Sequence, residues 1–235
     1  MFSYRNDPDT DGVGIAFFDA VAPGGGRLDL TLGDARAWRS PDWDLVEAEL
    51  RVPVLNAYQV HGARVLRVGA ADDPVAIARE QADALITTEH GLGLAVRAAD
   101  CLPVLMVDAE ATVIGAAHAG RVGLAAGVLL ELVAQLRARG SGAVRAWIGP
   151  HICGECYEVP ASLQEQYCRE LPAARAQTSW GTPSLDLGQA AADQLAGAGC
   201  QVVRLDPCTL TTTSLHSHRR DAAASGRQAG VIWLP

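Results

Sequence analysis

The sequence predicts an α/β or α+β fold that forms one compact unit. Short apolar segments of four to six residues, bounded by glycine, aspartate or proline, recur after residue 58 and are typical of strands. Segments with helical spacing of apolar residues lie between them. The 235 residues contain no internal repeat and no low-complexity linker. We therefore expect strands and helices to share one core, although periodicity does not decide between the two fold classes.

The N-terminal part has the least regular pattern. Residues 1–12 contain three aspartates and a proline, and we expect an irregular tail there. The glycine run at 24–26 predicts a loop, and Ser40-Pro41 is a typical helix start. The elements expected in this part are strands at 13–18 and 28–32 and a helix at 43–50.

The rest of the chain predicts further strands and three longer helices. Leucine and valine spaced by four residues indicate the first of these helices, and Gly140 follows it as a stop. In chain order the elements are strands at 65–68, 84–87, 92–96, 103–107 and 113–117, a helix at 123–139, a strand at 143–148, helices at 162–170 and 186–198, and strands at 202–205 and 231–234.

The composition excludes several chemistries. The chain has no lysine, because all 19 Lys+Arg residues are arginines. A P-loop, a Schiff-base or pyridoxal enzyme and a protein kinase each need a lysine, so none of these is compatible with the sequence. The net charge of -8 argues against binding to nucleic acid or to an anionic membrane.

The N-terminus has no apolar core of a signal peptide, and no segment is as apolar as a membrane span. We therefore expect a cytoplasmic protein. The six cysteines are then expected as free thiols or metal ligands rather than as a disulfide framework.

Three side chains stand in contexts that suggest chemistry. His61 lies in Gln59-Val-His-Gly62, Cys101 follows Ala99-Asp100, and His118 ends an apolar strand. Strand ends are where open sheets place reactive groups, and two imidazoles with one thiolate suit catalytic zinc. The separations are too long for a local metal motif, so two alternatives stay open. One is a buried cysteine with two core histidines, and the other is a Cys101–His118 nucleophile pair of a thiol hydrolase.

Two further clusters carry weaker signals. Cys153-Gly-Glu-Cys156, with His151 nearby, lacks the second cysteine pair of a structural zinc site, since Cys200 and Cys208 are scattered. A redox pair or two buried thiols are the favoured interpretations. The C-terminal segment holds the densest positive charge, which indicates either a phosphate pocket or an internally paired cluster. Its arginines are Arg219, Arg220 and Arg227.

The stretch from about Val13 to Leu234 contains nine short blocks, the first beginning at Gln59 and the last ending at Gln228. They are Gln59-Val-His-Gly62, Ala82-Asp-Ala84, Ala99-Asp-Cys-Leu-Pro-Val104, Ala117-His-Ala-Gly120, Gly149-Pro150, Tyr157-Glu-Val159, Cys208-Thr209, Ser217 to Asp221 and Gly226-Arg-Gln228. Together they resemble the YfiH-like family, domain of unknown function 152. Its members are described as polyphenol oxidoreductase laccases, purine nucleoside phosphorylases or factors that affect peptidoglycan.

The resemblance implies an α+β fold, with mixed sheets layered as an αββα sandwich in a single domain over residues 1–235. It implies one transition metal, usually zinc and in some members copper, held by His61, Cys101 and His118. It also implies phosphorolysis of adenosine, inosine and methylthioadenosine, with deamination of adenosine, so the expected partners are a purine nucleoside and inorganic phosphate.

The chain departs from the family pattern at several positions. Arg121 stands where the family has tryptophan, and Val122 stands where it has arginine. Ala98 replaces a usual threonine, and His218 replaces an aromatic residue. The N-terminal family blocks are degenerate, with 24–26 and 30–33 as the nearest matches. These departures concern substrate contacts more than the metal ligands.

The residue content also indicates which of the activities described for the family are compatible with this chain. Six histidines, with one His-x-His pair, are too few for a multicopper site, and a single blue-copper ion would need Met106 as its axial ligand. Zinc deaminases have a catalytic glutamate two residues after a histidine ligand, and neither His61 nor His118 is followed by one. Deamination would therefore need Asp100 or Glu155 as its acid or base.

We therefore expect a zinc-dependent purine nucleoside phosphorylase. His61, Cys101 and His118 would hold the metal, and the expected catalytic residues are these three and Asp100. The expected phosphate ligands are Arg219, Arg220 and Arg121. A single-copper polyphenol oxidase, a thiol hydrolase and a non-catalytic cell-wall factor stay open as alternatives.

Overall fold

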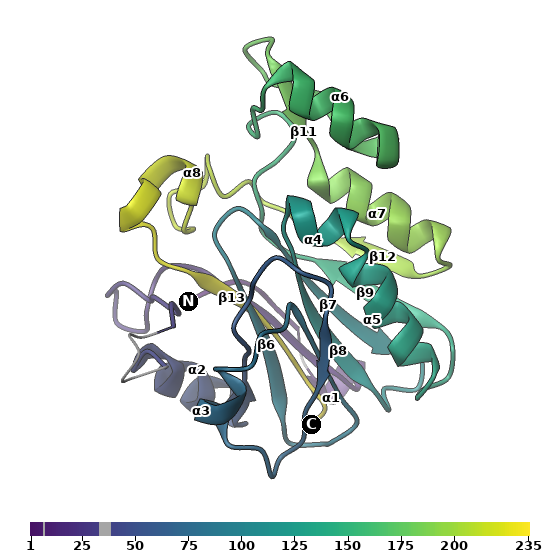
Figure 1. Cartoon of the computed structure of the whole chain (residues 1–235). Helices are drawn as coiled ribbons and strands as arrows, with labels where there is room; N and C mark the ends of the chain where they lie inside the picture. The colour runs from purple at the N-terminus through teal and green to yellow at the C-terminus, as the bar shows by residue number, and fades with distance from the viewer. Residues whose placement is uncertain (7, 33–38) are drawn as a thin grey trace.

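The chain folds into two mixed sheets stacked face to face, with helices on both outer sides (Figure 1). The computed structural model describes residues 1–6, 8–32 and 39–235, so Gly33 of the degenerate N-terminal block lies outside the described residues. The fold is α+β in an αββα arrangement, which confirms the class that the resemblance implied.

The first sheet has six strands, and most of its neighbouring pairs are antiparallel. Only the outer pairs β12–β9 and β4–β5 run parallel. Across the sheet, the strands are β12 (Gln201–Arg204), β9 (Val144–Ile148), β7 (Leu102–Asp108), β8 (Ile114–Ala119), β5 (Ala84–Thr87) and β4 (Val65–Arg67).

The second sheet has five strands and contains both ends of the chain. Across it, the strands are β1 (Phe2–Arg5), β2 (Gly14–Phe18), β13 (Gln228–Trp233), β6 (Gly93–Ala98) and β3 (Val54–Leu55). A separate hairpin consists of β10 (Arg175–Gln177) and β11 (Pro183–Leu185).

Alternation along the strands builds the layers, because successive side chains point to opposite faces. On β7, Leu105 and Val107 pack between the two sheets, whereas Val104 and Met106 face the helices. On β2, Phe17 packs between the sheets, whereas Phe18 packs under α2 (Asp42–Leu50).

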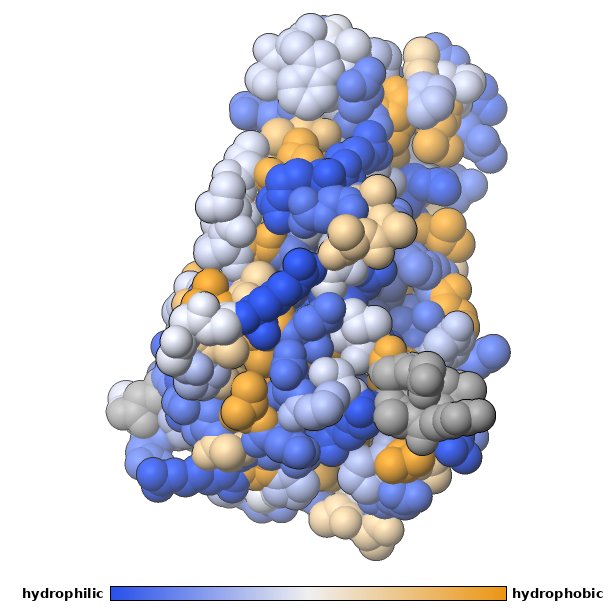
Figure 2. Space-filling model, turned by 90° about the vertical axis from the view of Figure 1, so that its left-hand side faces the viewer, coloured by the Kyte–Doolittle hydropathy of each residue, from blue (hydrophilic) through white to orange (hydrophobic). Residues whose placement is uncertain are grey.

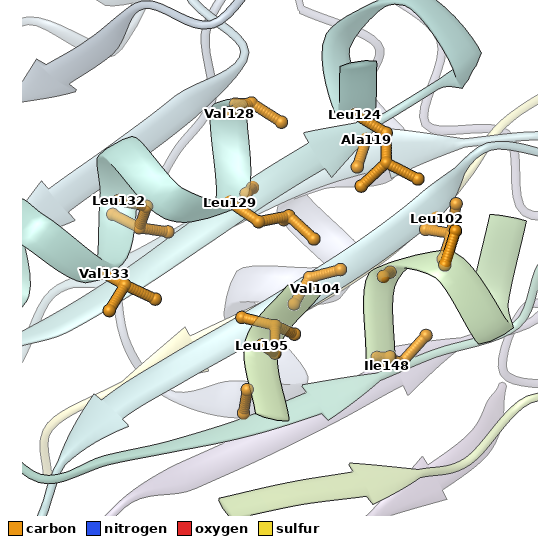
Figure 3. Packing of buried hydrophobic residues seen from close by; sticks show 14 of the residues in the cluster. Leu102, Val104, Ala119, Leu124, Val128, Leu129, Leu132, Val133, Ile148 and Leu195 are labelled. Carbon is orange, nitrogen blue, oxygen red and sulfur yellow. The ribbon is translucent and has the colours of Figure 1, made fainter. Parts of the chain in front are cut away.

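Helices α4 (Arg121–Ala125), α5 (Val128–Arg137) and α7 (Leu187–Gly197) cover the six-stranded sheet. Figure 3 shows Leu129 and Leu132 of α5 directed at the strands beside Val104. Helix α6 (Ala161–Glu170) lies next to the hairpin, above α7 in Figure 1. Short helices complete the described chain: α1 (Pro8–Asp11), α3 (Pro74–Ile77), α8 (His218–Asp221) and 3-10 turns at Pro172–Ala174 and Ala222–Ala224.

Three predictions about elements are wrong. The irregular tail contains β1, because Phe2 stacks on Phe18 with ring centroids 4.8 Å apart and the strand pairs with β2. Residues 28–32 form no strand, since the N–H groups of Leu28 and Leu30 donate to separate partners, the carbonyls of Ala20 and Arg227.

The third wrong element is the continuous helix at 123–139. It is broken into α4 and α5 at Gly127, whose φ of 84° lies in the left-handed region that glycine tolerates. The break lets α4 turn away from the axis of α5 (Figure 1). In the described part of the chain, no helix combines the length and apolar character that crossing a membrane requires.

Candidate metal centre and active site

His61 lies on the loop that leads from β3 in one sheet to β4 in the other. Its φ of 60° is left-handed, which is uncommon for a residue with a side chain. The buried carboxylate of Asp83 holds this loop by accepting backbone N–H bonds from Val60 at 3.1 Å, His61 at 2.9 Å and Gly62 at 2.7 Å. Asp83 therefore fixes where the His61 imidazole is presented.

Cys101 lies on another crossing from the five-stranded to the six-stranded sheet, where β6 ends and β7 begins. The preceding Asp100 has a left-handed φ of 87°. Both of its carboxylate oxygens are occupied, because Oδ1 accepts from the Thr209 hydroxyl and Oδ2 accepts from the Arg219 N–H, each at 2.6 Å. Asp100 thus secures the turn that presents Cys101.

His118 is buried near the end of β8, opposite Pro103. Its Nδ1 lies 2.9 Å from Asp83 Oδ1. Burial lowers the pKa of His118 below its ordinary value, more than the Asp83 hydrogen bond raises it, so the ring is neutral at neutral pH. Because the Asp83 carboxylate only accepts, Nδ1 carries the proton and Nε2 keeps its lone pair. This is the arrangement typical of a metal-binding histidine.

The three side chains converge. Their potential ligand atoms all lie within 4.8 Å of one another, and the Cys101 sulfur is 3.8 Å from His61 Nε2. The two imidazoles meet edge to face with centroids 4.8 Å apart. Tetrahedral zinc, with bonds of about 2.3 Å to sulfur and about 2.0 Å to nitrogen, places such ligands about 3.5 Å apart. The donor set therefore fits a zinc-sized ion with little movement.

The surroundings of the three ligands also fit a metal ion. A Cβ at Gly120 would lie 2.6 Å from His61 Cδ2 and 3.0 Å from the Cys101 sulfur, so only glycine leaves room there. Burial raises the pKa of Cys101 to about 12, with a further contribution from Asp100. A thiolate at neutral pH would therefore need a bound cation beside it. Since the sulfur contacts His61 and its thiol is hard to ionise, the geometry does not favour the Cys101–His118 nucleophile pair.

Two cavities lie at this place: His61, Cys101 and His118 all line one of them, and of the three only Cys101 lines the other. The larger has a volume of about 630 Å³, within the range of small-molecule sites, and the smaller has about 190 Å³. Ala99, Cys101 and His218 line both, so the cavities meet beside the sulfur. The surrounding face, which carries α8 and is turned to the viewer in Figure 2, is mainly hydrophilic and shows no broad hydrophobic patch in its described part.

The predicted arginines have different surroundings. Arg121 and Arg219 line the smaller cavity, where the Arg219 guanidinium lies 5.2 Å from the Tyr157 ring centroid. Arg220 lines neither cavity: its guanidinium donates to the carbonyls of Thr209 at 2.8 Å and Leu215 at 2.6 Å, and pairs with Asp221. The structure therefore leaves Arg220 and Glu155 outside the site and brings the other predicted residues together: His61, Asp100, Cys101, His118, Arg121 and Arg219.

Sequence reasoning missed Arg97, which lines the larger cavity together with Arg227. Burial, and then the charge of Arg227, lower the pKa of Arg97 to about 10, so it remains a cation at neutral pH. Its Nε has no hydrogen-bond partner among the described residues. The available signal was an arginine directly after the predicted apolar strand at 92–96. Asp83 was missed too, because an aspartate before a strand looks like an ordinary turn residue.

Met106 faces the helix-side core in β7, five residues beyond Cys101. At the rise of a strand, this separation corresponds to about 16 Å. Met106 is therefore too far from the sulfur to serve as the axial ligand of a blue-copper site.

Comparison with known proteins agrees with this architecture. Residues 27–235 match the family described as "Multi-copper polyphenol oxidoreductase laccase". A Streptomyces coelicolor protein named as a purine nucleoside phosphorylase is 44% identical over 181 residues, which cover 75% of this chain and 73% of that protein. A Mycobacterium tuberculosis protein with the same name is 41% identical over 179 residues, or 75% of this chain and 70% of that protein.

Solved structures show the same fold. A Neisseria meningitidis protein of domain of unknown function 152 superposes with a TM-score of 0.78 at 28% identity, covering 98% of this chain and 97% of its own. YlmD from Geobacillus stearothermophilus also superposes with a TM-score of 0.78 at 28% identity, and the match covers 97% of this chain and 94% of the YlmD chain. With the three converging ligands, the αββα fold and these matches, the chain belongs to the YfiH-like family, domain of unknown function 152, of polyphenol oxidoreductase laccases.

Proposed function

We propose that this chain is a metal-dependent purine nucleoside phosphorylase, with Zn²⁺ held by His61, Cys101 and His118. The observation that carries the proposal is the convergence of these ligands at the junction of two cavities, one of which is lined by two arginines and by no described carboxylate. The names of the relatives that are 41–44% identical support the same reaction.

The larger cavity provides the features of a phosphate site. Arg97 and Arg227 lie close enough for their charges to oppose one another, and no carboxylate lines this cavity among the described residues. The Nε of Arg97 is buried and has no hydrogen-bond partner among the described residues. A phosphate dianion in this cavity would offset the charges of both arginines. This pair suits phosphate better than the predicted Arg121 and Arg219, whose cavity also contains Asp100.

The smaller cavity suits the purine base. Ile152, Tyr157 and Leu187 give it apolar walls, and Arg121 and His218 add polar groups. The ribose would then lie where the cavities meet, beside Cys101, so that phosphate from one side reaches the carbon that releases the base on the other. Zn²⁺ would supply an electrophile that polarises a substrate oxygen at this junction. The chain's own contribution is to orient the substrates and to stabilise phosphate charge.

Deamination receives no comparable support. It needs a carboxyl group able to move protons, and Asp100 is the only carboxylate among the described residues lining either cavity. Both Asp100 oxygens already accept hydrogen bonds, and Glu155 lines neither cavity.

The direct test of the proposal is an assay of the zinc-loaded protein with inosine and inorganic phosphate. We expect stoichiometric hypoxanthine and ribose 1-phosphate, followed by chromatography, and no product without phosphate. Absence of turnover by protein with verified zinc content, across inosine, adenosine and methylthioadenosine, would overturn the assignment.

The arginine assignment gives a second expected result. Arg227→Gln should raise the KM for phosphate by about tenfold or more, because it removes one charged donor from the larger cavity, while the KM for the nucleoside changes little. Arg121→Gln is the matched control in the smaller cavity and should show the opposite pattern. Steady-state kinetics with each substrate varied in turn measure both values. If the two variants exchange these effects, the phosphate lies in the smaller cavity instead.

A further inference from the structure

Three cysteine sulfurs meet at a second place in the molecule. Those of Cys153, Cys156 and Cys208 lie within 4.8 Å of one another, and none of these residues lines either cavity at the first site. The sequence separates Cys208 too far from the Cys-x-x-Cys pair to suggest this grouping. The fold brings it there through a parallel bridge between His151 and Cys208 and a hydrogen bond from Thr209 N to His151 O.

The backbone presents the three sulfurs in a defined way. The carbonyl of Cys153 accepts from the N–H groups of Cys156 and Tyr157, each at 3.0 Å, so the Cys-x-x-Cys segment is a closed turn. The N–H of Cys153 donates to the Cys208 sulfur at 3.5 Å. A backbone donor aimed at sulfur stabilises a thiolate more than a thiol. The turn is anchored at Gly154, whose carbonyl accepts from the buried Ser184 hydroxyl.

The donor set selects a class of ligand. Three sulfurs converging from two segments favour a thiophilic ion such as Zn²⁺ over oxygen-seeking Mg²⁺ or Ca²⁺. Cys156 is buried, whereas Cys153 and Cys208 are half-buried, so one side of the cluster is open to solvent for a fourth ligand such as water. A disulfide would use two of the sulfurs and leave the third without a role.

We propose that Cys153, Cys156 and Cys208 bind one Zn²⁺ ion as a structural site, separate from the metal centre at Cys101. Binding would release the thiol protons and leave three thiolates on the ion. The site would join the loop at 151–158 to the segment at 206–212.

This junction supports the first site through hydrogen bonds. Thr209, next to Cys208, donates its hydroxyl to Asp100 Oδ1, and the N–H of Ile152, next to Cys153, donates to the Asp100 carbonyl at 3.1 Å. Asp100 holds the turn that presents Cys101. A metal ion at the cysteine cluster would thus fix both segments that position this turn.

The test counts metal ions on the full chain. Reduced, chelator-treated protein is titrated with Co²⁺ and then Zn²⁺, and thiolate-to-cobalt charge-transfer absorption reports sulfur ligands. We expect two ions per chain in the wild type and one in either Cys101→Ser or Cys208→Ser. The absorption remaining in Cys101→Ser should be about three times that remaining in Cys208→Ser, since three thiolates rather than one contribute. Affinity at the cluster should fall by about 100-fold or more in Cys208→Ser.

Matched controls are Cys168→Ser and Cys200→Ser, which replace buried cysteines outside both clusters and should leave two ions bound. If Cys208→Ser does not fold, alkylation of the wild type serves instead: Zn²⁺ should protect Cys153, Cys156 and Cys208 from iodoacetamide, as read by peptide mass spectrometry. One ion per chain with no protection of these residues overturns the proposal. So does a count of four rather than six free thiols in denatured, unreduced protein, which would indicate a disulfide.

Discussion

Replacing Cys101 with alanine should reduce phosphorolysis by about 1000-fold or more and remove the metal ion from the first site. The reason is the donor set: without the sulfur, only His61 and His118 remain, and two neutral imidazoles hold a divalent ion far less tightly than a set that includes a thiolate. Elemental analysis and inosine turnover of the same protein sample measure both effects. Cys101→Ser should behave like the alanine variant, because a hydroxyl is a poor zinc ligand.

The fold should survive this change, since Cys101 is only half-buried and lies on a turn rather than in a strand. Cys200→Ala is the matched control, as it removes a buried thiol remote from the cavities and should keep full activity. Wild-type turnover by Cys101→Ala, or by protein freed of metal, would contradict the proposed role of the site.

Replacing Asp83 with asparagine should have the largest effect on stability. The carboxylate accepts four hydrogen bonds, from His118 and from the N–H groups of residues 60, 61 and 62, and its side chain is fully buried. In asparagine, an NH₂ group replaces one of the two carboxylate oxygens and faces N–H donors that it cannot accept from. About two of the four donors are then left unpaired, which lowers the free energy of unfolding by about 2–4 kcal/mol. For a chain of this length, that loss lowers the Tm by roughly 5–15 °C, measurable by calorimetry.

The same variant should lower metal affinity by about 10–100-fold, because His118 loses the acceptor that fixes its tautomer. The control is Asp73→Asn, since Asp73 is an exposed cap of α3, where asparagine caps as well as aspartate. Unchanged metal affinity in Asp83→Asn would show that Asp83 does not position His118.

The Asp83 contribution should depend on pH in one direction. Burial raises the pKa of Asp83, but the bonds from His118 and Gly62 outweigh it and leave the pKa below the ordinary value of 3.8. Because the pKa of Asp83 is lower in the folded state than in the unfolded state, its ionised carboxylate stabilises the fold fully at any pH above the unfolded-state pKa. This stabilisation is lost as the pH falls through the folded-state pKa. The difference in unfolding free energy between wild type and Asp83→Asn should therefore be constant near neutrality and narrow only below about pH 4.

Most strands were predictable from the sequence because they depend on the apolar residues within their own segment. Apolar runs such as Ala84–Thr87 and Ile114–Ala119 became strands, because burying alternate side chains on both faces requires such runs. Residues 28–32 carry the same pattern but remain outside the sheets, since strand formation also needs a neighbour with a continuous free edge. Gly127 looked compatible with a helix, but its φ is left-handed, and the preceding α4 packs closely against the His61 loop at Gly123, a contact that the local pattern does not reveal.

The candidate site divides in a similar way. His61, Cys101 and His118 were predictable as a group because each has a distinctive local context, and the fold brings them together. Asp83, Arg97 and Cys208 were not, because their roles depend on neighbours that are distant in sequence. Arg220 was misleading for the opposite reason: its charge suggested a ligand, whereas backbone carbonyls around it use that charge to hold the segment at 209–215.

The two loops that carry His61 and Cys101 both pass from the five-stranded sheet to the six-stranded sheet. His118 belongs to the six-stranded sheet alone, so an ion held by the three proposed ligands would link the two sheets. The chain would then close its sandwich and complete its reactive centre in one event. A partly folded molecule whose two sheets have not yet packed together would therefore lack the complete site and would have no activity.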